Sequence, residues 1–422
     1  MQTEADVLIV GAGLAGLTCA SELARAGVEA IVFDASDGVG GRARTDEVDG
    51  FLLDRGFQVL LTAYPATGRV LDYDRLDLRP FEPGSLVRIG GMFHQVSDPF
   101  RRPASALATL RAPIGSLADK RRVASLALEL RSRSVQDILS AEETPTLDRL
   151  RELRFSDRMI ECFFRPFLGG VFLDPDLATS SRMFEFVFKM FGAGPVAVPA
   201  DGMGALARQL AEELPAGALR LDSPVARVST DSVTLGSGET LRARAIVVAT
   251  DWETACTLTG LEESPAFRPA LCWYFESEEP PVAQGILVLD GEGRGPVTNL
   301  AVMSRVSDRY APSGRELISA TVLGEAEPSA ELLQQVRAQM TDWFGPTADT
   351  WRELSHYRIR AALPDQSLPA GGVNPRPGLT ADGIHVCGDH RVHGSIEGAI
   401  QSGVATAGQV VAALAGAGAR AP

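Results

Sequence analysis

Three glycines and one aspartate near the start of the chain have the types and the spacing of a dinucleotide site. Gly11, Gly13 and Gly16 form a GxGxxG pattern, and Asp34 follows Gly16 by 18 residues. The first glycine of such a pattern permits a tight turn, the second lets a pyrophosphate approach the backbone, and the third lets the next helix pack closely. The helix N-terminus attracts the anion, and the carboxylate accepts the ribose hydroxyl groups. The pattern predicts a bound dinucleotide, with a purely structural glycine turn as the alternative.

The segments around these residues have the order strand, helix, strand that such a site needs. Residues 6–10 and 28–33 are apolar and predict strands, while residues 14–24 carry apolar side chains at helical spacing. Gly27 suits the left-handed residue that ends a helix. The unit predicts a Rossmann-type α/β domain but does not distinguish NAD from FAD.

A second glycine-rich loop follows, and it carries two arginines. Gly40, Gly41, Arg42 and Arg44 would place guanidinium groups opposite the helix, where they neutralise a pyrophosphate. A solvated loop is the alternative that charge alone leaves open.

This loop resembles the flavin amine oxidase and phytoene desaturase superfamily, whose members carry GGR with a further arginine two residues later. The resemblance implies that these four residues hold the diphosphate of a non-covalent FAD. It continues at residues 54–58, and it implies that Gly56 and Phe57 pass beside the isoalloxazine ring.

The far end of the chain carries a second signature. A predicted strand ends at Gly388 and Asp389, and a predicted helix begins at Ser395, a good N-cap residue. Gly398 and two later glycines lie inside that helix and each costs about 1 kcal/mol relative to alanine, so either a flavin ring or a packed neighbour should approach closely. The run resembles the C-terminal FAD signature of plant-type phytoene desaturases and protoporphyrinogen oxidases. That likeness implies that Asp389 contacts the phosphate or ribityl part of FAD and that the backbone of Ile396 faces the flavin.

Two predicted strands in the middle of the chain, residues 219–228 and 245–250, complete the expected domain. The resemblance implies that Val225 meets the adenine and that Thr250 closes under the diphosphate, although composition alone makes both segments simply buried strands. The expected fold class is α/β, with a Rossmann-type FAD-binding domain assembled from three sequence segments and an α+β substrate domain. The expected boundaries are residues 1–75, 200–255 and 376–422 for the FAD-binding domain, and 76–199 and 256–375 for the substrate domain.

The amino-acid composition limits the kinds of partner and the cellular location that are expected. Forty Lys and Arg against 54 Asp and Glu give a net charge of −14, which disfavours nucleic acid as a partner. The five cysteines are scattered singly, so no metal site is expected and a reducing cytoplasm fits best. The acidic N-terminus is unlike a signal peptide, and no run of 18 apolar residues predicts a membrane span. A cytoplasmic protein is expected.

One segment departs from the acidic average. Residues 101–133 hold eight Lys or Arg and only two acids, and Val123, Leu126 and Leu130 lie on one predicted helical face. Such a face could rest on anionic lipid as a peripheral membrane contact. A solvated lid helix is the favoured explanation.

Half of the phenylalanines gather in one stretch. Aromatic stripes are more often core than pocket, yet a flavin enzyme needs an apolar wall that excludes water from its substrate. An apolar small-molecule substrate is therefore expected. The nine residues are Phe155, Phe163, Phe164, Phe167, Phe172, Phe184, Phe186, Phe188 and Phe191.

The expected reaction is dehydrogenation of an apolar, isoprenoid-like molecule by hydride transfer to flavin N5. Because the cofactor carries the chemistry, few catalytic side chains are needed and none is assigned. His390, Arg391 and His393 could face the flavin and relay a proton, or they could be surface loop residues. The electron acceptor, oxygen or a quinone, is left open.

Two alternatives remain. Amine oxidases of the superfamily combine a lysine with an aromatic cage, but no aromatic residue follows Tyr357. Lys120 is expected to be solvated, and Lys189 is expected to pair with Glu185 at i, i+4. The other alternative is a redox-silent flavoprotein that acts as a binding module.

Overall fold

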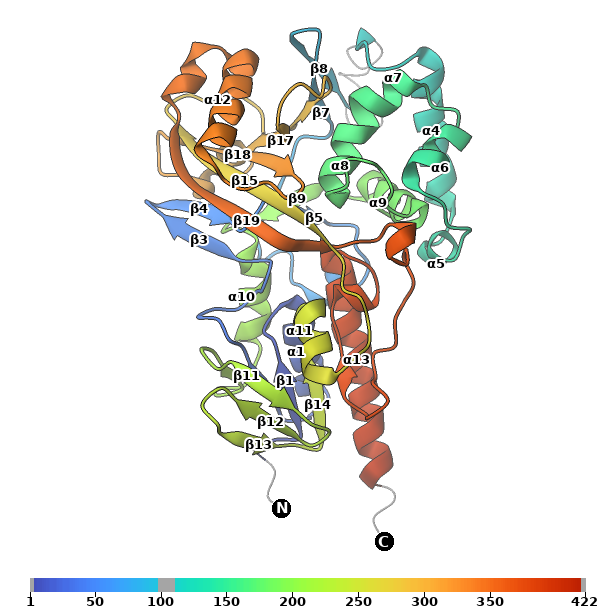
Figure 1. Ribbon diagram of the computed structural model, residues 1–422, viewed down its shortest axis with the longest axis vertical. Helices are drawn as coiled ribbons and strands as arrows, with labels where there is room; N and C mark the ends of the chain where they lie inside the picture. Colours follow the sequence, from blue (N-terminus) through green and yellow to red (C-terminus); the bar gives the residue numbers. More distant parts are fainter. Residues whose placement is uncertain (1–3, 98–110, 419–422) are drawn as a thin grey trace.

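A parallel sheet of five strands lies in the lower half of the molecule in Figure 1. The computed structural model describes residues 4–97 and 111–418. β1 and β14 are buried along their whole length, as strands covered on both faces must be. The strands, from one edge to the other, are β10 (Leu219–Arg220), β2 (Ala30–Phe33), β1 (Val7–Val10), β14 (Ala245–Val248) and β20 (His385–Val386).

Helices cover one face of this sheet and a small sheet covers the other. α1 (Leu14–Arg25) packs against α13 (Ile396–Gly418) and α10 (Gly204–Glu212). On the other face the apolar side chains of the parallel strands share a core with an antiparallel sheet. Its strands are β11 (Val225–Val228), β12 (Ser232–Leu235) and β13 (Thr240–Arg242).

The strand expected over residues 219–228 is two strands in two sheets. β10 joins the parallel sheet, whereas β11 pairs with β12. Between them Asp222 has a φ of 49°, a left-handed conformation that ends an extended run. The expectation of a single strand was therefore wrong.

A mixed sheet of seven strands stands above the parallel sheet in Figure 1. All neighbouring strands in it are antiparallel except β16 and β7. α12 (Ala330–Phe344) packs on one face through a core that includes Trp273 and Trp343. The order is β19 (Arg352–Pro364), β15 (Phe267–Ser277), β18 (Glu316–Leu323), β17 (Val297–Val302), β16 (Leu287–Asp290), β7 (Ser85–Ile89) and β8 (Met92–Val96).

A helical region lies beside the seven-stranded sheet, and short strands connect the two halves (Figure 1). The helices are α4 (Leu117–Ser132), α5 (Val135–Leu139), α6 (Thr146–Glu152), α7 (Asp157–Met159), a π-helical turn (Ile160–Phe164), α8 (Arg165–Phe172) and α9 (Ser181–Ala193). The connecting elements are the hairpin β3 (Thr45–Val48) and β4 (Phe51–Asp54), the sheet β5 (Leu60–Leu61), β9 (Val196–Pro199) and β6 (Leu78–Pro80), and the helix α2 (Thr67–Val70). The helix α11 (Trp252–Thr259) belongs to the lower half, where it packs against β11 and β14.

The apolar face of α4 points inward. Leu126 is 2% exposed and Leu130 is 0% exposed, and Val123 packs beside them. The protein core therefore covers Leu126 and Leu130 and leaves them unavailable to lipid, whereas Val123 is half-buried. Residues 101–110 of the basic segment lie outside the described residues.

α13 is long and apolar enough to cross a membrane by composition alone, although 44% of its most apolar window is buried in the protein. Its apolar character follows from packing on α1. A side chain at Gly403 would clash with the backbone of Ala15, so this glycine permits close helix packing. Nothing lies within 4 Å of a side chain built at Gly408, so packing does not explain that glycine.

Candidate active site

One large cavity runs from the parallel sheet to the helical region. Its volume is about 2050 Å³, roughly twice the upper end for a drug-sized ligand, so a dinucleotide and a second molecule can share it. The predicted cofactor-binding residues line it, with the exceptions of Gly16, Arg44 and Gly398. The sequence therefore predicted residues that tertiary structure brings to one continuous space.

The turn between β1 and α1 leaves the start of the helix open toward the cavity. Gly11 has a φ of 109°, and a side chain at Gly16 would clash with the carbonyl oxygen of Gly11. Gly13 is the N-cap of α1 and, within the described chain, no side chain caps this end. Unpaired N–H groups at a helix N-terminus form an anion site, so this turn fits the pyrophosphate of FAD.

Asp34 directly follows β2 at the wall of the cavity, and it also stabilises the loop around it. Its Oδ2 accepts a hydrogen bond from Ala12 N at 2.6 Å, and its Oδ1 accepts one from Ser36 N at 2.9 Å. An ionised carboxylate has about four acceptor positions, which leaves capacity for a ribose hydroxyl. Replacing Asp34 would therefore disturb the conformation of the turn as well as the binding of a ligand.

The two loop arginines separate in space. Arg42 lines the cavity and pairs with Asp389, which also lines it, across 2.6 Å. Arg44 pairs instead with Asp37 at 2.9 Å and lies outside the lining. Of the two guanidinium groups expected to face one pyrophosphate, only that of Arg42 lies at the cavity, and its contact with a pyrophosphate stays a prediction.

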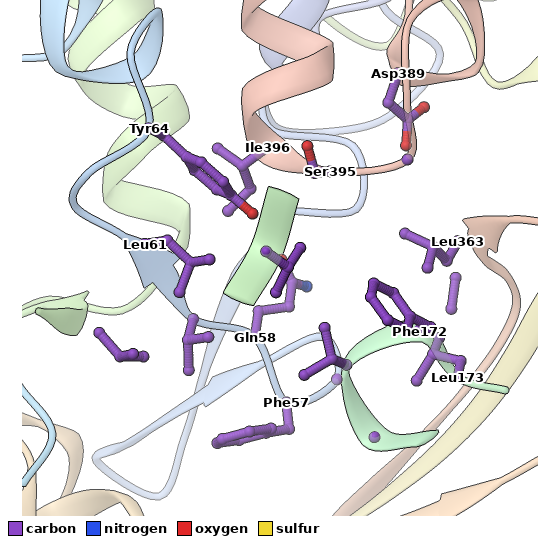
Figure 2. A pocket seen from close by; sticks show the side chains of 18 of the residues that line it. Phe57, Gln58, Leu61, Tyr64, Phe172, Leu173, Leu363, Asp389, Ser395 and Ile396 are labelled. Carbon is purple, nitrogen blue, oxygen red and sulfur yellow. The ribbon is translucent and has the colours of Figure 1, made fainter. Parts of the chain in front are cut away.

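The start of α13 forms another part of the wall. Ser395 caps the helix, because its Oγ accepts a hydrogen bond from Gly398 N at 3.0 Å. A side chain at Gly398 would clash with the carbonyl oxygen of His393, so a neighbour in the same chain, and not a flavin ring, explains this glycine. Figure 2 shows Tyr64, Ser395 and Ile396 together on one side of the cavity.

His390, Arg391 and His393 do not face the cavity. His390 stacks on Trp252, Arg391 pairs with Glu263 at 2.8 Å, and His393 packs against Phe186. Burial lowers the pKa of both histidines to about 4, so both are neutral at pH 7. Both alternatives, a proton relay beside the flavin and a surface loop, were therefore wrong, because these three side chains are buried in the protein interior away from the cavity.

Phenylalanines divide between the core and the cavity. Phe155, Phe164, Phe184 and Phe186 are buried in the core. The cavity is lined by Phe163, Phe167, Phe172, Phe188 and Phe191. Figure 2 shows Phe172, Leu173 and Leu363 close together, on the side away from Leu61 and Tyr64. Both interpretations of the aromatic stretch are thus correct for different residues.

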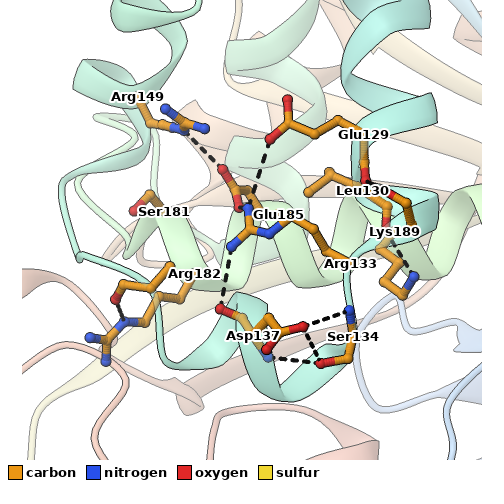
Figure 3. A network of polar contacts seen from close by, with 12 residues as sticks. Glu129, Leu130, Arg133, Ser134, Asp137, Arg149, Ser181, Arg182, Glu185 and Lys189 are labelled. Atoms are coloured by element: carbon orange, nitrogen blue, oxygen red, sulfur yellow. Dashed lines mark hydrogen bonds and ion pairs between the residues drawn. The ribbon is translucent and has the colours of Figure 1, made fainter.

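A buried carboxylate holds the helices of this wall together (Figure 3). Glu185 on α9 is 4% exposed and pairs with Arg133 at 2.5 Å and Arg149 at 2.9 Å. Lys189 instead donates to the carbonyl oxygens of Leu130 and Arg131. The expected pair of Lys189 with Glu185 was therefore wrong, because Arg133, which directly follows α4, and Arg149 on α6 occupy the carboxylate.

Lys120 is not simply solvated. Its Nζ donates to the carbonyl oxygen of Ala112 at 2.9 Å, its side chain lines the cavity, and burial lowers its pKa. Sequence reasoning also missed Tyr64, which stacks on Phe186 at 5.8 Å and lines the cavity. The only sequence signal for Tyr64 as a cavity residue was its aromatic side chain, since no motif surrounds this position.

Comparison with known proteins agrees with this geometry. A protein-family model described as flavin containing amine oxidoreductase matches residues 14–411. Carotenoid phi-ring synthase from Streptomyces griseus is 25% identical over 96% of this chain and 86% of its own length. Protoporphyrinogen oxidase 2 from Arabidopsis thaliana is 26% identical over 44% of this chain, and the match spans only 37% of that relative.

A solved structure shares the fold. The structure titled putative protoporphyrinogen oxidase from Exiguobacterium sp. 255-15 superimposes with a TM-score of 0.70 at 16% identity, covering 97% of this chain and 99% of that one. The mixed α/β architecture with several sheets is thus that of FAD-dependent oxidoreductases. Because the family model spans nearly the whole chain, the protein belongs to the flavin-containing amine oxidoreductase family and is an FAD-dependent oxidoreductase.

Proposed function

We propose that this enzyme dehydrogenates an apolar small molecule of isoprenoid-like character. The observation that carries the proposal is the wall of five phenylalanines around the part of the cavity between α4, α8 and α9. An apolar molecule gains about 25 cal/mol for each Å² that it buries there.

The charge of the same wall disfavours the amine-oxidase alternative. The cavity-lining residues on α4 and α9, both described in full, include Lys120, Arg121, Arg131 and Lys189 but no acid. Like charges repel an ammonium group that enters an apolar space. A neutral substrate avoids that penalty.

We further propose that residues 1–75, 200–255 and 376–422 form the FAD-binding domain. The five parallel strands come from these three segments. The lining residues Gly11, Asp34 and Asp389 follow the carboxyl ends of β1, β2 and β20, where α/β sheets bind ligands. Residues 76–199 and 256–375 supply the substrate side.

In this arrangement the protein positions the substrate beside the flavin and shields both from water, and its own side chains need not react. Bound FAD supplies the acceptor for the hydride. The phenylalanines exclude water, and the ion pair of Arg42 with Asp389 ties the loop after β2 to the segment before α13. A contact between the basic segment and a membrane stays a prediction.

Anaerobic flavin reduction tests the proposal. A panel of polyenes, prenyl compounds and reduced tetrapyrroles should contain a compound that bleaches the flavin, whereas primary amines and polyamines should not. Rapid reduction by a small amine alone would restore the amine-oxidase alternative. A photoreduced flavin that neither air nor a quinone reoxidises would instead support a redox-silent protein.

A further inference from the structure

A polar row crosses the cavity side of the seven-stranded sheet. In the strand register Asn299 pairs with Thr321, and Thr321 pairs with Cys272. All three residues line the cavity. Their sequence neighbours, such as Trp273 and Leu300, pack in the core under α12 on the opposite face. Alternation along the strands therefore places the row on the substrate side.

Two oxygens in this row have no hydrogen-bond partner. Asn299 and Thr321 are each 4% exposed, and neither Asn299 Oδ1 nor Thr321 Oγ1 meets a partner among the described residues. Cys272 differs, because its Sγ lies 3.2 Å from Ser319 Oγ. Buried polar atoms without partners are rare in folded proteins and call for an explanation.

Gly170 makes room for the Asn299 amide. A side chain built at Gly170 would lie 2.7 Å from Asn299 Nδ2. Gly170 stands inside α8, where glycine is a poor helix former. The amide nitrogen thus lies against α8, while Asn299 Oδ1 remains available as an acceptor, and the paired residue Thr321 offers a hydroxyl.

We propose that Asn299 and Thr321 bind a hydroxyl group of the otherwise apolar substrate. A hydroxyl can donate to Asn299 Oδ1 and accept from the Thr321 hydroxyl at the same time. A hydrocarbon would leave both oxygens unpaired, and an ether has no proton for Asn299. The inference rests on the proposed apolar substrate. It adds that this substrate carries a hydroxyl group, by which the protein distinguishes it from a hydrocarbon.

Binding of matched probes to the FAD-loaded protein tests the inference without turnover. Calorimetry compares 1-decanol, its methyl ether and decylamine. We expect 1-decanol to bind about tenfold more tightly than the ether, because the ether leaves a buried acceptor unpaired. Thr321→Val and Asn299→Leu should abolish the preference, whereas Thr321→Ser should keep it.

Thr18→Val is the matched control. The Thr18 hydroxyl is also buried without a partner in the described chain, but Thr18 lies outside the cavity lining, so the variant should keep the preference. Equal binding of alcohol and ether, or an unchanged preference in Thr321→Val, would overturn the hydroxyl assignment while leaving the apolar substrate intact. Binding of decylamine alone would overturn both proposals.

Discussion

Phe188 and Phe184 lie one turn apart on α9 and offer a matched test of the cavity wall. Their rings are 5.8 Å apart, but Phe188 lines the cavity whereas Phe184 is 0% exposed in the core. Phe184→Ala should cost about 3–5 kcal/mol of unfolding free energy. That loss lowers Tm by roughly 3–6 °C for a chain of this size.

Phe188→Ala should act on the ligand instead. A ligand that covers one face of the ring removes ~60 Å² from water, which is worth ~1.5 kcal/mol and about a tenfold change in Kd. Titration of 1-decanol into each FAD-loaded variant measures the change in Kd, and thermal unfolding measures Tm. Equal losses of affinity in both variants, or a large drop in Tm with unchanged affinity for Phe188→Ala, would refute the division between wall and core.

Three further predictions follow from particular contacts. Arg42→Ala should weaken non-covalent FAD binding about ten- to a hundredfold, since a charged hydrogen bond is lost and Asp389 loses its partner; fluorescence of released FAD measures it, and unchanged affinity would contradict the site. Gly403→Ala should destabilise the fold because it forces α13 away from α1, whereas Gly408→Ala, with open space around it, should stabilise the helix by up to about 1 kcal/mol in chemical denaturation. Burial raises the pKa of Asp54 to about 6, so its protonation stabilises the fold below about pH 4 and this contribution is lost as the pH rises through 6. Relative to Asp54→Asn, the wild-type unfolding free energy should therefore fall by about 0.8 kcal/mol between pH 5.5 and 7.5, and a pH-independent difference would contradict the assignment.

Local patterns predicted the βαβ unit because its signals act within a few residues. Gly27 has a φ of 74° just beyond α1, as a helix-ending glycine should. Asp34 lies at the carboxyl end of β2, and Ser395 caps α13. Each of these features depends on backbone conformation or hydrogen bonds that a short segment decides by itself.

The predictions that were wrong concern the contacts of individual side chains. Lys189 had a carboxylate at helical spacing, but Arg133 and Arg149, which lie far from Glu185 in the sequence, bind that carboxylate. His390 and His393 follow Asp389 in sequence, yet the chain turns both into the interior. Side chains from distant segments can bind the same charged group or fill the same buried space. The spacing of residues along the chain does not show which of them does so.

The sequence alone thus determined a glycine turn after the first strand, an acidic residue at the end of the second strand and a capped C-terminal helix, because turn geometry and helix capping are local. Only the tertiary structure decided which phenylalanines face the cavity, and that Asn299 and Thr321 stand side by side on its wall. The physical reason is that strand register and helix packing bring together residues far apart in the chain, and burial then decides which polar atoms are left for a ligand.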